Sequence, residues 1–252
     1  MLIQRYYATV EYDGTDFLGY QFQPNARTVQ GEIEKVIAKV TKAFIRIDGA
    51  GRTDTGVHAV GQVIAFNVAW KHNLEDLHRA LNAILPKDIV IKTLGIITEP
   101  FSPRFDALNR SYRYTIFNQA WPTILMARYA YHIKPQLNLE LMNDASQLLI
   151  GTHNFASFGK PTQGNNTVRQ ITQAKWSTIG TQLNFDITAN AFLYRMVRNI
   201  VGTLIQVGLG RLQVSRVQDI LLAQDLKAGS YTAPPHGLCL MSVTYPETVK
   251  LS

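Results

Sequence analysis

The side chains best suited to chemistry lie in a short run, residues 49–59. This run combines one carboxylate, Asp54, with one guanidinium, Arg52, two threonines and three glycines. Glycine permits backbone angles closed to other residues, or the close approach of another molecule, and arginine can bind phosphate or carboxylate through two parallel hydrogen bonds. The pattern before the run is helical and the pattern after it is strand-like. Asp54 is therefore expected on a loop held by packed elements, where catalytic groups tend to lie.

The same residue types allow two other interpretations. An exposed turn with solvated charges would have this composition, and the spacing alone leaves that reading open. The triplet Asp54-Thr55-Gly56 is also typical of aspartic proteases, in which two carboxylates share one proton. The sequence has one such triplet, so a protease would need a symmetric dimer. The nearby cation of Arg52 would favour ionised carboxylates over proton sharing, so the protease interpretation is disfavoured.

Hydrophobic periodicity predicts the elements that position this loop in the first half of the chain. Alternation predicts strands over 5–12, 62–68 and 89–97. Helical spacing predicts one helix opened by Thr28 and a second opened by Asn73. Residues 99–104 contain two prolines and are expected to form the seam between two halves.

The second half shows a similar order of elements. We expect a strand over 112–117 with Tyr112 and Tyr114 on one face, a helix opened by Asn138, a loop over 153–167, and a hairpin of 171–178 with 183–188. A helix over 192–207, a short helix opened by the pair Ser215 and Gln218, and a strand over 238–243 follow. The sequence thus predicts two related α+β domains, 1–105 and 106–252.

Composition and charge narrow the class of protein. The 252 residues are 46% hydrophobic and 17% charged, which is typical of a soluble globular protein. The net charge is +7, and residues 106–252 carry 13 Lys or Arg against 7 Asp or Glu. A basic half favours an anionic partner, most often nucleic acid, although many mildly basic proteins have none.

Several classes of protein are not expected. No apolar run approaches the roughly 20 residues that cross a bilayer, so no membrane association is predicted. The single cysteine, Cys239, excludes an intramolecular disulfide and fits a reducing cytoplasm. The six histidines are scattered without ligand spacing, so no metal site is predicted. No motif for a small-molecule cofactor is present either.

The chain resembles the tRNA pseudouridine synthase A family over nearly its whole length. The run 51–59 (GRTDTGVHA), followed by Gly61-Gln62-Val63, is similar to the catalytic motif of that family. Further blocks occur in the family's order, at residues 11–15 (EYDGT), 19–21 (GYQ), 28–31 (TVQG), 110–114 (RSYRY), 154–158 (NFASF) and 196–202 (MVRNIVG). We therefore expect a cofactor-free isomerase that converts uridine to pseudouridine at positions 38, 39 and 40 of the tRNA anticodon stem-loop.

The resemblance also implies a fold and an assembly. The two ferredoxin-like or RRM-like units are expected to form one extended antiparallel sheet with helices on one face and a central catalytic cleft. A cytoplasmic homodimer is expected as well.

The resemblance assigns catalytic roles to three residues. Asp54 is the expected nucleophile, either at C6 of the base or at C1′ of the ribose, and the sequence leaves both routes open. Tyr112 matches the tyrosine that stacks on the target uracil, and Arg198 matches the arginine that pairs with the aspartate. Arg52 is expected to splay the RNA or displace the base. His58 is placed with the substrate-binding residues, although holding the loop together with Gln62 is its preferred role.

Remaining RNA contacts are expected from the basic second half and from four further arginines, Arg27, Arg104, Arg110 and Arg113. Phosphate contacts of this kind position RNA without reading its sequence, so recognition by shape is expected. The chain departs from the family by Tyr20, where tryptophan is usual, and by Tyr194-Arg195, where histidine is common. A non-catalytic RNA-binding or chaperone protein remains the alternative of a different class.

Overall fold

The computed structural model describes residues 2–229 and 231–249, which separate into two compact units. Within those ranges, unit 1 comprises residues 2–108 and 240–249, and unit 2 comprises residues 109–229 and 231–239. Unit 1 extends beyond the expected proline-rich seam and also includes the C-terminal segment. The division into domains 1–105 and 106–252 stays a prediction.

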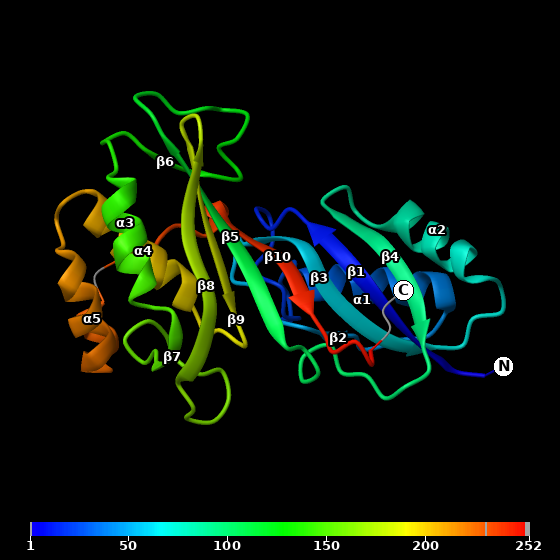
Figure 1. Ribbon diagram of the computed structural model, residues 1–252. Helices are drawn as coiled ribbons and strands as arrows, with labels where there is room; N and C mark the ends of the chain where they lie inside the picture. The colour runs from blue at the N-terminus through cyan, green and yellow to red at the C-terminus, as the bar shows by residue number, and fades with distance from the viewer. Residues whose placement is uncertain (1, 230, 250–252) are drawn as a thin grey trace. The chain divides into compact units, whose positions relative to one another are not determined.

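Unit 1 has a ferredoxin-like arrangement of strands (Figure 1). Its elements are β1 (Gln4–Tyr12), α1 (Val29–Thr41), β2 (Asp48–Gly49), β3 (His58–Val68), α2 (Leu74–Ile84) and β4 (Ile89–Ile97). β1 pairs antiparallel with both β3 and β4, and β2 pairs antiparallel with β3. The order β4-β1-β3-β2 places the connection between β2 and β3, which contains Asp54, at one end of the central strand β3.

Both helices of unit 1 begin where the sequence predicts. The Thr28 side chain accepts a hydrogen bond from the Gly31 amide at 3.2 Å, and the Asn73 side chain accepts one from the Asp76 amide at 2.7 Å. Each cap provides a partner for an amide that has none inside the helix. These two predictions are confirmed.

Strand β1 is buried on both faces. Tyr6 stacks on Phe66 with ring centroids 5.6 Å apart. On the opposite face Tyr7 joins a buried cluster with Val63, Ala65, Ile97, Phe101 and Ala50, and the C-terminal residues Val243, Tyr245 and Val249 pack against it. The end of the chain therefore supplies the apolar cover for the second face of the strand.

Unit 2 repeats the same core order with additions. Its elements are β5 (Asn109–Asn118), β6 (Tyr131–Ile133), α3 (Leu139–Gln147), β7 (Gly151–Asn154), β8 (Val168–Ile179), β9 (Gln182–Ala189), α4 (Met196–Gly208) and α5 (Val214–Ala223), and β10 (Leu238–Thr244) begins in this unit. β9 pairs antiparallel with β5 and β8, and β7 with β8, whereas β6 pairs parallel with β5. The order β5-β9-β8 repeats the order β1-β3-β2. Helix α3 packs against α4, α5 and β8 (Figure 1).

The expected α+β class, with related and mostly antiparallel units, is confirmed. Some boundaries differ. α4 begins at Met196 and not at residue 192, because Arg195 has a left-handed backbone with φ of 62°. α5 begins at Val214 after Gln213, so Ser215 is not its cap. β6 and β7 were not expected, and β7 takes in the first two residues of the expected loop 153–167. In the part of the chain that the structure describes, no helix is both long and apolar enough to cross a membrane.

Asn118 provides a test of the unit 2 core. Its buried amide donates to the carbonyls of Ile133 and Pro135 at 2.8 and 2.7 Å and accepts from the Leu137 amide at 2.9 Å. We expect Asn118→Ala to lower the free energy of unfolding by about 2–4 kcal/mol, because three backbone groups lose their partner. Urea unfolding measures this loss.

Asn138→Ala is the matched control, since Asn138 is exposed and caps one helix through a single bond to the Leu141 amide. Its loss is expected to cost about 1 kcal/mol. Equal costs for the two variants would contradict the assigned role of Asn118.

Candidate active site

Asp54 lies half-buried in the loop 50–57, which connects β2 to β3. Two hydrogen bonds with β3 hold the beginning of this loop. The Ala50 amide donates to the Val63 carbonyl at 2.8 Å, and the Gln62 side chain donates to the Gly51 carbonyl at 2.9 Å. Within the loop the Val57 amide donates to the Asp54 carbonyl at 3.1 Å, so the backbone of Asp54 is part of a closed turn.

Tyr12 at the end of β1 and the segment 13–20 that follows it also contact the loop. The Tyr20 amide donates to the Thr53 carbonyl at 3.1 Å, and the hydroxyls of Tyr12 and Thr53 lie 2.8 Å apart. Gly19 has a φ of +87°, and a Cβ there would lie 3.0 Å from the Thr53 carbonyl oxygen. At Gly14 a Cβ would overlap the Val57 carbonyl. The two loops are therefore in contact through their backbones.

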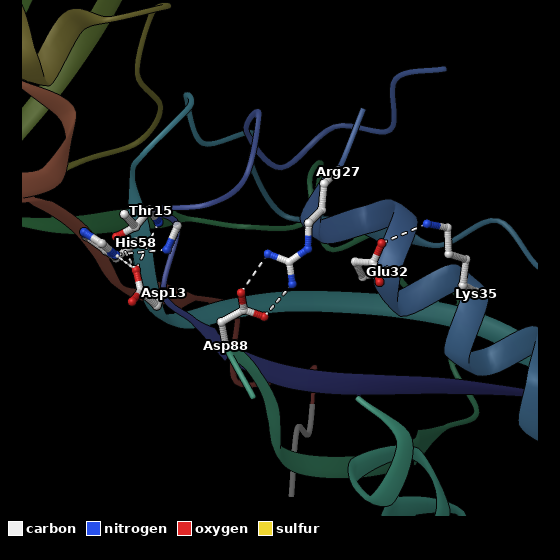
Figure 2. A network of polar contacts seen from close by, with 8 residues as sticks. Asp13, Thr15, Arg27, Glu32, Lys35, His58 and Asp88 are labelled. Carbon is white, nitrogen blue, oxygen red and sulfur yellow. Dashed lines mark hydrogen bonds and ion pairs between the residues drawn. The ribbon is translucent and has the colours of Figure 1, made fainter. Parts of the chain in front are cut away.

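His58 joins the same two loops and is buried, with 5% of its surface exposed. Its Nδ1 atom lies 3.0 Å from the Gly14 amide and 3.2 Å from Asp13 Oδ1. Neutral Nδ1 can accept the amide proton of Gly14, and protonated Nδ1 can donate to Asp13. Asp13 Oδ1 also accepts from the amide and hydroxyl of Thr15 at 3.0 and 2.6 Å (Figure 2). These contacts support the loop-holding role expected for His58.

Tyr20 forms an apolar support beneath the beginning of the loop. Its ring is 3% exposed and lies directly against Gly49, where a side chain would overlap it. The burial of the phenol raises its pKa well above the ordinary value, and the nearby Tyr12, Glu34 and Asp48 act in the same direction. Tyr20 is therefore neutral at physiological pH and serves as a packing group.

Tyr112 and Arg198 are positioned within unit 2. Tyr112, 9% exposed on β5, meets Phe192 edge-on with ring centroids 5.2 Å apart. Arg198, in the first turn of α4, donates from Nε to the Ala233 carbonyl at 2.8 Å, and its own carbonyl accepts the Ala233 amide at 3.0 Å. Burial raises the pKa of the neighbouring Tyr114 well above the ordinary value, and the charge of Arg198 acts in the opposite direction.

Two of the arginines expected to contact RNA form bidentate ion pairs inside their own unit. Arg27 donates to both oxygens of Asp88 at 2.8 and 2.9 Å (Figure 2), and its guanidinium lies 4.1 Å from the Phe17 ring centroid. Arg113 donates to both oxygens of Asp186 at 2.8 and 3.0 Å. The hydrogen bonds with these carboxylates raise the pKa of each arginine.

The other three arginines have different surroundings. Arg110 donates to the Asn190 carbonyl at 2.8 Å, Arg104 lies 5.5 Å from the Phe105 ring centroid, and Arg52 is exposed. Asp54 and Arg52 therefore share one loop of unit 1, and His58 begins the strand that follows it, whereas Tyr112 and Arg198 belong to unit 2.

Sequence patterns did not predict the groups that hold these side chains, namely Asp88, Asp186, Phe192 and the carbonyl of Ala233. These pairings depend on strand register and loop path. No local spacing in the sequence signals them, although Asp13 and Gly14 are part of the quoted block 11–15. Among the described residues, no group of three or more His, Cys, Asp or Glu could hold a metal ion.

Sequence comparison with known proteins identifies the family of this chain. A sequence model of the family described as tRNA pseudouridine synthase matches residues 8–106 and 145–246. This chain belongs to the tRNA pseudouridine synthase family. It is similar to the tRNA pseudouridine synthase A of Bacillus subtilis (strain 168), with 43% identity over 240 residues that cover 94% of this chain and 97% of the relative.

Two further relatives of the same name show similar agreement. The protein of Thermoanaerobacter sp. (strain X514) is 42% identical over 94% of this chain and 97% of its own length. That of Thermosipho melanesiensis is 40% identical over 96% and 100%. Membership of the tRNA pseudouridine synthase family confirms the expected class of enzyme, an isomerase.

A solved Cbf5-Nop10-Gar1 complex contains a chain that aligns with 94% of this one. The alignment covers 58% of that chain with 12% identity and a TM-score of 0.33, a likeness too weak to carry an argument.

Two glycines test the loop contact in this tRNA pseudouridine synthase family member. Gly14→Ala places a Cβ on the Val57 carbonyl, so we expect a loss of about 1–3 kcal/mol of unfolding free energy and a loss of activity. Gly51→Ala meets nothing within 4 Å, so its stability should stay within about 0.5 kcal/mol of wild type. Urea unfolding with a pseudouridine assay measures both. Equal stability of the two variants would contradict the described contact.

Proposed function

We propose that this protein isomerises uridines 38, 39 and 40 of the tRNA anticodon stem-loop to pseudouridine, with Asp54 as the nucleophile. The observation that carries the proposal is the backbone hold on the Asp54 loop in a chain of the tRNA pseudouridine synthase family. A nucleophile on such a loop can be aligned with its target before the substrate arrives, which removes much of the entropic cost of reaction.

The reaction breaks the C1′–N1 bond of the uridine, turns the base and joins C5 to C1′. A carboxylate can assist by covalent attack on C6 of the base or on C1′ of the ribose, and both routes remain open. The atoms of the product are those of the substrate, apart from the proton that C5 loses and N1 gains. The isomerisation therefore consumes no oxidant, reductant or second substrate.

Two residues of unit 2 complete the proposed chemistry. Tyr112 provides an aromatic ring for the flipped uracil, as enzymes that act on an extruded base require. Phe192 fixes that ring by its edge-on contact. Arg198 supplies the positive charge that favours an ionised nucleophile, and its hydrogen bond to Ala233 restricts the orientation of its guanidinium.

The other residues expected to bind RNA differ in how far their contacts within the protein leave them available. Exposed Arg52 is suited to displace the base or splay the strand, and His58 is proposed to act by holding the loop. Arg27 and Arg113 can contact phosphate only with guanidinium atoms beyond those that bind Asp88 and Asp186, whereas Arg104 and Arg110 stay candidates for phosphate contacts. We further propose a homodimer and a cytoplasmic location.

Asp54→Asn tests the nucleophile, because it keeps the size of the side chain and removes the charge. We expect pseudouridine formation in an unmodified tRNA transcript to fall by at least about 10⁴-fold, within the range by which loss of a nucleophile lowers kcat in other enzymes, while tRNA affinity changes less than threefold. Asp48→Asn is the control, since Asp48 is exposed and pairs with Arg5 at the surface. Full activity of Asp54→Asn would refute the role of Asp54.

The same assay separates the enzyme from a non-catalytic RNA-binding protein. Tight tRNA binding by the wild type without product would refute the proposed reaction.

Arg198→Lys and Arg198→Met test the charge near the reaction. Lysine keeps a positive charge but lacks the planar fork of arginine, and methionine keeps the apolar stem alone. We expect kcat at saturating tRNA to fall about tenfold for the lysine variant and more than 100-fold for the methionine variant, with KM changed less than fivefold. Single-turnover kinetics measures both. A change confined to KM would contradict a role in the chemical step.

A further inference from the structure

Three exposed residues of unit 2 lie together and have no part in the proposed chemistry. The Arg195 guanidinium lies 4.9 Å from the centroid of the Tyr194 ring, and the Tyr194 side chain is 47% exposed. The backbones of Tyr194 and Lys160 form an antiparallel bridge, with the Tyr194 amide donating to the Lys160 carbonyl at 2.9 Å. The side chains of Lys160 and Arg195 are exposed. One aromatic ring and two cations are thus grouped on the surface.

The backbone at Arg195 is unusual for a residue with a side chain. Its φ of 62° and ψ of 6° lie in the left-handed region, and its side chain makes no capping hydrogen bond to α4. Glycine adopts this conformation without steric cost, whereas other residues are strained there. Folding alone would therefore favour glycine at this position. Replacing Arg195 by glycine would remove its charge and relieve the backbone strain at the same time.

The stretch of sequence that contains this group, between Asp144 and Asp219, is basic. Residues 145–218 contain seven Lys or Arg and one acidic residue, Asp186. Asp186 binds Arg113 through both carboxylate oxygens and is therefore already paired with a cation. A potential of this sign attracts a polyanion.

The segment that carries the group also supports the residue proposed to hold the target base. Phe192 contacts Tyr112 edge-on, Tyr194 and Arg195 follow, and Arg198 lies one helical turn further on. The bridge to Lys160 and the close contact of Gly159 with Leu193 and Tyr194 fix the path of this segment. A ligand on Tyr194 and Arg195 would therefore lie on the segment that packs against Tyr112.

We infer that Tyr194, Arg195 and Lys160 form a nucleotide platform that binds an unpaired nucleotide of the tRNA substrate outside the reacting uridine. The Tyr194 ring stacks on the base, as aromatic residues do with single-stranded nucleic acid, and the two cations contact flanking phosphates. The nucleotide is unpaired because a base in a helix has no free face for the ring. This inference rests on the proposed function, since it assigns part of the binding of the same substrate.

Arg195→Gly tests the platform without straining the backbone, because glycine accepts the left-handed conformation. We expect unchanged or higher thermal stability and an increase in the Kd for unmodified tRNA of about fivefold or more. The negative slope of log K against log salt concentration should fall in magnitude by about one. Lys42→Gly is the matched control. Lys42 is an exposed cation of unit 1 with the same φ of 60°, so the control removes equal charge and equal strain.

Tyr194→Phe and Tyr194→Ala test the stacking. The phenylalanine variant should bind tRNA like the wild type, and the alanine variant should bind about tenfold more weakly with an unchanged salt slope, because it loses a ring and not a charge. Binding to a stem-loop transcript and to a fully paired duplex of equal length distinguishes an unpaired nucleotide from a duplex as the ligand. If Tyr194→Ala binds the stem-loop more weakly than the wild type does and binds the duplex equally well, the platform is supported.

The outcomes distinguish this inference from the proposed function. Pseudouridine formation by the wild type, with tRNA affinity and salt slope of Arg195→Gly equal to those of Lys42→Gly, would overturn the platform and leave the enzyme intact. Equal weakening of stem-loop and duplex binding would also overturn it. Weaker stem-loop binding by Arg195→Gly and Tyr194→Ala in a protein that makes no product would support the platform and refute the reaction.

Discussion

The structure of unit 1 depends on one constraint, the contact of the Asp54 loop with the segment that follows β1. The Tyr20 amide donates to the Thr53 carbonyl, the Gly14 amide donates to the His58 side chain, and Gly14 and Gly19 lie against the backbone of the loop. Backbone contacts tolerate no added atoms, which explains why glycine occupies positions 14 and 19. The loop can therefore keep its shape while the side chains of Arg52 and Asp54 extend from it.

Ion pairs within each unit also fix the positions of side chains and of neighbouring segments. Asp88 holds Arg27 beside Phe17. The backbone carbonyl of Asp88 accepts the Asp13 amide at 3.0 Å, so Asp88 also contacts the segment that supports the Asp54 loop. Asp186 holds Arg113 across the β5–β9 pair. Partly buried bidentate pairs of this kind fix geometry more than they add stability. Several cations of this basic protein therefore act on the fold, and net charge alone overstates its RNA-binding surface.

The sequence predicted the strands and helices better than it predicted where they begin and which distant segments they contact. Strands β1, β4, β8 and β9 and the caps at Thr28 and Asn73 follow from local alternation and capping chemistry, and the structure contains them. Local patterns could not predict the start of α4, since the helical spacing continues back to residue 192 and the left-handed Arg195 ends it. They also could not show that the Tyr7 face of β1 is covered by residues 243–249, because that contact joins the two ends of unit 1.

The same limit applies to the candidate site. Asp54, Tyr112 and Arg198 were found through motifs, and their chemical roles stay predictions. Their supports, among them Phe192 and the Ala233 carbonyl, depend on contacts between distant segments. The two units share one strand order, but they differ in the connection that carries the proposed nucleophile. The connection β8–β9 is a two-residue hairpin at Gly180, whereas its counterpart β2–β3 spans residues 50–57 and carries Asp54. A tight hairpin has no room for a supported side chain, so the longer connection in unit 1 is the one that can present a nucleophile.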